Sequence, residues 1–121
     1  MAGIVEVGAT GMAGSTTLHT IPIADVTNGS ITLVTSPGAT AVIYVTGYAL
    51  SFSGTVNATF QSSTGPASIG GLMRGVVNSY FTQAVMPPSF MFSTAKGDDL
   101  NLNLSAGTQV DGWVTFFFGP V

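Results

Sequence analysis

The chain has 121 residues, of which 45% are hydrophobic and only 6% are charged, and its formal net charge at pH 7 is −3. This length fits one domain, and the shortage of charge excludes long helices held by Glu–Lys pairs, since about 25% of residues are charged in a typical soluble protein. Two basic residues, Arg74 and Lys96, are too few to bind nucleic acid through its phosphates, and the absence of cysteine excludes disulfides and thiolate metal sites.

Residues 1–16 are rich in Gly, Ala, Ser and Thr, which predicts a flexible N-terminal arm outside the core. Their first residues are neither basic nor continuously apolar, so we expect no secretory signal. The glycine-rich residues 8–14 resemble a dinucleotide-binding loop, but that motif requires a helix at its last glycine. The β-branched residues that follow, and Pro22 after them, favour an arm instead.

Beyond residue 16, apolar and polar residues alternate with period two, which predicts β-strands. We expect strands near residues 17–25, 30–35, 40–52, 55–61, 100–104 and 110–118. Asn28-Gly29 and Ser53-Gly54 are two-residue hairpin signals between consecutive strands. The strand at 40–52 is apolar on both faces, with Val42, Tyr44, Tyr48, Leu50 and Phe52 on one and Ile43, Val45 and Ala49 on the other. This pattern is typical of a strand covered on both sides or placed at a subunit contact, and the run is too short to span a bilayer.

Residues 68–92 show no clear period. We expect a strand near 67–72, a long loop, and a short strand near 89–93, with Pro87-Pro88 excluding a regular element at that point. The total of about eight short strands predicts an all-β domain over residues 17–121, in which two antiparallel sheets pack as a β-sandwich or jelly roll.

The sequence contains no pattern that predicts catalysis. His19 is the only histidine, and no nucleophile-elbow motif accompanies it, so an ordinary strand position is favoured over a hydrolase triad. Asp98, Asp99 and Asp111 are possible calcium ligands, but EF-hand spacing is absent, and residues 96–99 are better explained as a polar turn. We therefore expect no enzyme activity, no metal and no cofactor.

The aromatic residues are mostly expected in the core, because they pack well between two sheets. In the last strand the predicted inward face consists of Val110, Gly112, Val114, Phe116 and Phe118. Trp113 and Phe117 lie on the opposite face and are the best candidates for contact with another protein. In the arm, the apolar candidates are Ile4, Val5 and Val7, which are placed to lie across a partner or to add a strand to its sheet.

Two stretches resemble a known family. Residues 47–62, GYALSFSGTVNATFQS, are similar to the run gY-x-L-x-x-S-x-x-V-x-v-x-F-x-S of small phage jelly rolls. Residues 96–105 and 110–116 are similar to their closing pattern, G-[DE]-x-L-x-L-x-x-S followed by V-x-G-x-V-x-[YF]. Such domains occur in the decoration, or cement, proteins of tailed-bacteriophage heads, which have a jelly roll like that of tumour necrosis factor and often form trimers. The resemblance covers residues 40–118 and implies no catalytic residues.

The resemblance implies a structural virion protein that is made in the host cytoplasm and decorates the outside of a capsid. Its expected partners are the major capsid protein and further copies of itself, most often as a trimer, and neither nucleic acid nor membrane is expected. The alternative is a receptor- or glycan-binding module of a phage tail or fibre tip. For that alternative, Tyr80 and Phe81 in the predicted loop at 73–88 are the candidate contact residues.

Overall fold

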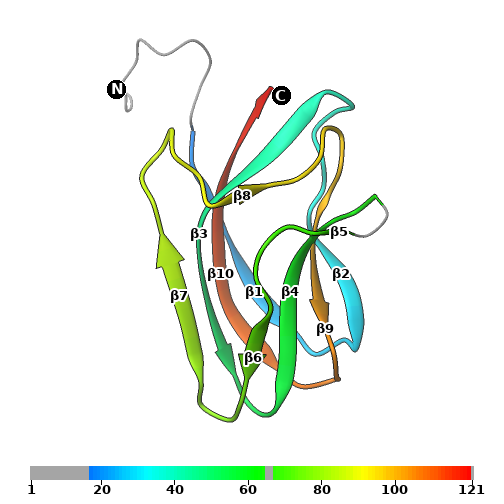
Figure 1. Cartoon of the computed structure of the whole chain (residues 1–121), viewed down its shortest axis with the longest axis vertical. Coiled ribbons are helices and arrows are strands. Elements are labelled where there is room, and N and C mark those ends of the chain that lie inside the picture. Colours follow the sequence, from blue (N-terminus) through cyan, green and yellow to red (C-terminus); the bar gives the residue numbers. More distant parts are fainter. Residues whose placement is uncertain (1–16, 65–66, 121) are drawn as a thin grey trace.

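The computed structural model describes residues 17–64 and 67–120, which form an all-β domain with two antiparallel sheets (Figure 1). The strands are β1 (His19–Asp25), β2 (Gly29–Val34), β3 (Ala41–Phe52), β4 (Val56–Ser62), β5 (Ala67–Ser68), β6 (Met73–Gly75), β7 (Tyr80–Ala84), β8 (Phe92–Ser93), β9 (Leu100–Leu104) and β10 (Val110–Pro120). In these two segments of the chain there is no helix, and hence none that could cross a membrane.

The strands pair as a jelly roll. Sheet A has the order β1-β10-β3-β7, with β8 also on β3, and sheet B has the order β2-β9-β4-β5, with β6 also on β4. The pairs are nested along the chain: β1 with β10, β2 with β9, β3 with β7 and β8, and β4 with β5 and β6. This nesting is that of two Greek keys folded into two sheets. The predicted fold class is therefore confirmed.

The two predicted hairpins are wrong, although both turns lie where the sequence placed them. Asn28-Gly29 lies where β2 begins, since Gly29 is its first residue, and Ser53-Gly54 falls between β3 and β4. In each case the two flanking strands belong to different sheets. A turn signal marks where the chain reverses, but the strand partner is decided by which apolar face each strand must cover. Here the chain crosses from one sheet to the other at both turns.

The middle of the chain contains strands that the sequence pattern did not reveal. The strand expected near 67–72 is only β5, two residues long, and β6 and β7 lie inside the predicted loop. The alternation of β7 is weak because Phe81 is the one residue in it that is not fully exposed. Pro87-Pro88 lies between β7 and β8, where a break was expected.

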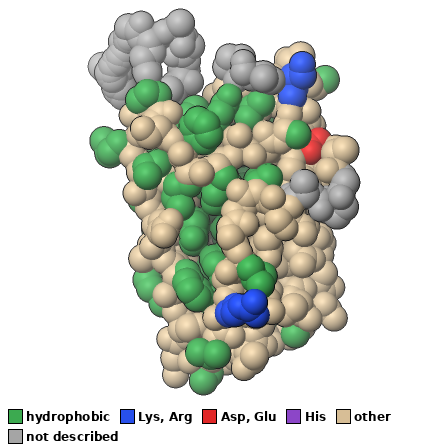
Figure 2. Space-filling model, in the orientation of Figure 1, with side chains coloured by type: hydrophobic (Ala, Val, Ile, Leu, Met, Phe, Trp, Pro, Cys, Tyr) green, Lys and Arg blue, Asp and Glu red, His purple; other side chains and the backbone are tan. Residues whose placement is uncertain are grey.

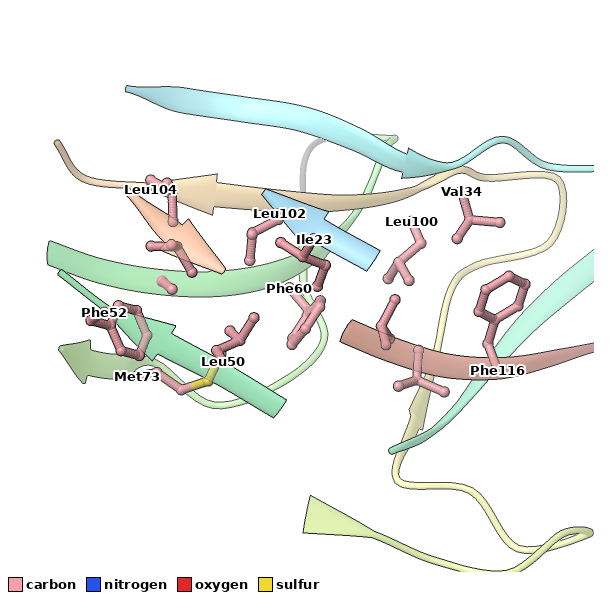
Figure 3. Close-up of a cluster of buried hydrophobic side chains, with 14 of the residues drawn as sticks. Ile23, Val34, Leu50, Phe52, Phe60, Met73, Leu100, Leu102, Leu104 and Phe116 are labelled. Carbon is pink, nitrogen blue, oxygen red and sulfur yellow. The ribbon is translucent and has the colours of Figure 1, made fainter. Parts of the chain in front are cut away.

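The core fills the space between the sheets and takes alternate residues from strands of both (Figure 3). In β9 the leucines at positions 100, 102 and 104 are buried, and Asn101 and Asn103 face outward, as predicted. The predicted inward face of β10 is also confirmed, because Val110, Val114 and Phe116 all lie in the core. Each such side chain contributes about 1.5–3 kcal/mol through burial.

An extra residue in β3 changes which side chains face the core. Thr115 of β10 pairs with Gly47, but Phe116 pairs with Val45, so Thr46 is bulged out of the register. The Thr46 hydroxyl donates a hydrogen bond to the Thr115 carbonyl oxygen, at 3.2 Å.

The bulge overturns the predicted division of this strand into two faces. Ile43 and Val45 join the same core as Leu50 and Phe52, instead of lying opposite them. Tyr44, which was predicted to share a face with Leu50, stacks instead on the outward-facing Phe117. A period-two pattern cannot reveal this change, because the bulge shifts the alternation by one residue.

Candidate functional site

The outer face of sheet B is polar and internally hydrogen-bonded. Ser30, Gln61 and Asn103 come from three adjacent strands of this sheet. The Ser30 hydroxyl lies 2.9 Å from Gln61 Oε1 and 3.1 Å from Asn103 Oδ1. Amide and hydroxyl groups arranged in this way are well solvated by water, so this face is suited to remain exposed.

The outer face of sheet A has a different character, because it is made largely of small or apolar residues and Asp111 is its charged residue among the described strands. Pro22, Trp113, Ala49 and Thr82 lie in register across its four main strands. Trp113 is 37% exposed, whereas Ala49 beside it is 1% exposed even though it points away from the core. A large aromatic side chain among small neighbours is a typical anchor for a protein contact.

The next row of residues across the outer face of sheet A includes Asp111, the charged residue of this face. Ala24, Asp111, Ser51 and Tyr80 lie in register, and the Tyr80 side chain is 61% exposed. Figure 2, which looks onto the margin of the fold where β7 and β6 lie, shows hydrophobic side chains gathered over the half of the view that contains β7. Exposed apolar side chains continue beyond the sheet, at Leu18, Val85, Met86 and Phe90.

Of the two contact residues predicted in β10, only Trp113 is exposed. Phe117 is 7% exposed because its ring stacks on Tyr44, with 5.0 Å between the ring centroids. Tyr44 in turn meets Phe90 edge-on, at 4.7 Å, and Phe90 is itself exposed. The surface aromatic residue at this end of the face is therefore Phe90, which sequence reasoning missed because the bulge placed Tyr44 over Phe117. The arm candidates Ile4, Val5 and Val7 lie outside the described residues.

His19 occupies an ordinary strand position in β1. Its ring stacks on Phe116, with centroids 5.4 Å apart, and packs at an angle against Phe118, at 5.2 Å. The imidazole thus extends the aromatic packing at this end of the sandwich. These ring contacts explain why an aromatic side chain occupies this strand position.

The three aspartates considered as calcium ligands do not form a cluster. Asp98 accepts hydrogen bonds from Ser62 and Thr64, Asp99 accepts one from the backbone N–H of Ser36 at 2.7 Å, and Asp111 accepts one from the Gln109 side chain. Across 17–64 and 67–120, no three acidic or histidine side chains come close enough together to hold a metal ion.

Comparisons with known proteins assign no family. No family model matches the chain, and neither does any curated protein. One similar solved structure is a chain of the disulfide-linked pili that form Bacillus endospore appendages. The two chains share 10% sequence identity, the match covers 95% of this chain and 99% of that one, and the TM-score is 0.45. A likeness this distant indicates no function.

Proposed function

We propose that this chain is a non-enzymatic structural protein of a virion, which binds the outside of an assembled capsid and bridges neighbouring shell subunits. The observation that carries the proposal is the contrast between the two outer faces, one polar and hydrogen-bonded and one largely apolar, with Trp113 exposed among small residues. The assignment to a capsid rests on the resemblance of residues 47–62 and 96–116 to phage decoration proteins.

The outer face of sheet A is the proposed contact between copies of the chain, and a trimer is the assembly that the resemblance favours. Small residues such as Ala49 and Gly47 allow a neighbouring surface to approach closely, and Trp113 supplies a large apolar area for burial. The near absence of charge on this face lowers the cost of removing it from water. The N-terminal arm, residues 1–16, is the proposed contact with the major capsid protein.

Binding to a shell suits a small module of this kind because many copies act together. Each contact can be weak on its own, since an oligomer that touches several shell subunits gains from effective concentration. A two-sheet sandwich with one shared core also holds its contact residues in fixed positions, which lowers the entropy lost on binding.

The number of copies per particle tests this proposal. Quantitative mass spectrometry of purified virions should find this chain at the same order of abundance as the major shell protein. A handful of copies per particle would favour a tail or fibre tip, and absence from particles would contradict a virion role altogether.

The variant Trp113→Ala tests the contact face. We expect the chain to fold normally, because Trp113 is exposed, but to dissociate into monomers in sedimentation and to be lost from particles. Loss of a central tryptophan raises a dissociation constant about thirtyfold, equivalent to about 2 kcal/mol. The matched control is Asn103→Ala on the outer face of sheet B, which should keep both assembly and binding. Equal behaviour of the two variants would rule out this face.

The alternative, a glycan- or receptor-binding tip, is supported by one observation, the 61% exposure of Tyr80. The second residue considered for it, Phe81, instead packs inward against Phe52, with ring centroids 5.5 Å apart. A glycan-binding role therefore depends on Tyr80, and glycan-array binding that disappears in Tyr80→Ala would favour it over the capsid role.

A further inference from the structure

The two sheets end in four edges, and the strand at each edge differs in how well it resists pairing with another chain. Sheet A ends at β1 on one side and at β7, with the two-residue β8, on the other, and sheet B ends at β2 and at the short β5 and β6. An edge strand presents unpaired backbone N–H and C=O groups, to which a further strand can bind. Folded proteins block such edges with proline, charge, bulges or very short strands.

Three of the four edges are blocked in one of these ways. β1 contains Pro22, which has no N–H to donate to a further strand. β2 has a bulge between Thr32 and Val34 in its pairing with β9, and this bulge interrupts the regular row of backbone N–H and C=O groups along the free edge of the strand. On the opposite side of sheet B, β5 and β6 are only 2 and 3 residues long, and β6 carries Arg74.

β7 has none of these features. Its five residues, YFTQA, contain no proline and no charge, and their pairing with β3 is continuous from Ala84 opposite Gly47 to Tyr80 opposite Ser51. All of them except Phe81 are exposed. Within the described residues no strand pairs with the outer edge of β7, which lies at the left margin of the fold in Figure 1.

The sequence of β7 is complementary to itself. If two copies pair antiparallel about Thr82, then Thr82 lies opposite Thr82 of the second copy, and Tyr80 lies opposite Ala84 of the second copy. Threonine pairs and aromatic–small pairs are favourable neighbours across strands, and no like charges meet. The large Tyr80 ring would lie beside the small Ala84 of the second copy, so the two side chains can pack without a clash.

We infer that β7 is an assembly edge, at which a second copy of this chain adds its own β7 antiparallel and joins two copies of sheet A into one continuous sheet. The contact is isologous and closes after two copies, so it links pairs and cannot grow into a fibre. It differs from the proposed contact through the outer face of sheet A, because its hydrogen bonds are made by the β7 backbone at the sheet margin, although Thr82 and Tyr80 also lie on that face.

Hydrogen exchange of the β7 backbone amides, measured at low and high protein concentration, tests this inference. The outward-pointing amides should exchange about tenfold or more slowly when the pair forms, because they then bond to the second copy. The variant Thr82→Lys places two ammonium groups opposite each other and should abolish both the protection and the paired species in sedimentation. Ala84→Lys is a second variant, which replaces the small residue opposite Tyr80 with a long charged side chain on the edge and should likewise weaken both.

The matched control is Thr32→Lys, the same substitution on an exposed residue of the β2 edge, which should leave β7 protection unchanged. Rapid β7 exchange at every concentration, or protection that survives both lysine variants, would overturn the inference. The proposed function fails separately, because Trp113→Ala removes the face contact but leaves the β7 edge intact and should retain the protection.

Discussion

Asp98 shows how a residue that resembles an exposed turn can be a structural anchor. Its side chain is 7% exposed and accepts hydrogen bonds from Ser62 Oγ at 2.5 Å, from the Thr64 backbone N–H at 2.9 Å and from the Thr64 hydroxyl. Ser62 Oγ also accepts a bond from the Ala95 N–H, at 2.9 Å. The sequence predicted the turn at residues 96–99 correctly, but it could not predict the burial, because the donors come from a distant part of the chain.

The hydrogen bonds to Asp98 make stability depend on pH. The Ser62 hydroxyl, followed by Thr64, holds the pKa of Asp98 below its ordinary value of 3.8, despite the opposing effect of burial. Their contribution is complete above that value and is lost as pH falls through the lower pKa of the folded protein. Urea unfolding at decreasing pH should therefore show falling stability in the natural chain and a smaller dependence in Asp98→Asn.

At neutral pH we expect Asp98→Asn to lower the free energy of unfolding by about 1–3 kcal/mol, because the Asn amide cannot accept all three hydrogen bonds. Asp111→Asn, at an exposed aspartate, should change it by less than about 0.5 kcal/mol. If Asp98→Asn kept the full pH dependence, the assignment to Asp98 would be wrong.

At the scale of the strand, the contact between β10 and β3 depends on Gly112. Its φ is +153°, and a Cβ placed on it would lie 1.8 Å from the carbonyl oxygen of Ala49. Only a residue without a side chain therefore allows the two strands to lie this close. Because β10 is also the sole sheet partner of β1, a disturbance at this point reaches both neighbouring strands.

We expect Gly112→Ala to destabilise the fold by about 3 kcal/mol or more, since the clash involves backbone that cannot move aside cheaply. Thermal unfolding followed by circular dichroism measures the effect. Gly71→Ala is the control, because a Cβ at Gly71 meets nothing within 4 Å. Similar melting temperatures for the two variants would show that β10 can shift to accept a side chain.

The strands that could be predicted from sequence are those with one face in the core. In β9, the leucines at positions 100, 102 and 104 alternate clearly with polar residues, because one face of sheet B packs in the core and the other faces solvent. β7 escaped prediction because it is an exposed edge, where burial does not impose a pattern. The exposure of Trp113 could be predicted from the alternation of β10. The burial of Phe117 under the Tyr44 ring could not, because the position of that ring depends on the bulge at Thr46.

At the scale of the whole molecule, the two sheets share one core and should unfold together. Leu102 belongs to sheet B and is fully buried, and its cluster includes Val114 and Leu50 of sheet A. The single tryptophan, Trp113, lies in sheet A and reports on that sheet by its fluorescence. A change in one sheet should therefore be detected in the other.

We expect Leu102→Ala to lower the free energy of unfolding by about 2–5 kcal/mol. Trp113 fluorescence and far-ultraviolet circular dichroism should shift together in urea, as two-state unfolding requires. Leu72→Ala, at a leucine that is 51% exposed, is the control and should have little effect. Two separate transitions in the Leu102 variant would mean that the sheets unfold independently.

The nesting of the strand pairs also bears on the order in which these pairs form during folding. β1 is synthesised long before its partner β10, and β2 long before its partner β9. β4 pairs with the distant β9 but also with β5 and β6, which follow it closely in the chain, so these last two pairings cost the least loop entropy. Contacts so distant in sequence close slowly. We therefore expect the pairing of β4 with β5 and β6 to form early and the pairs β1–β10 and β2–β9 to close late.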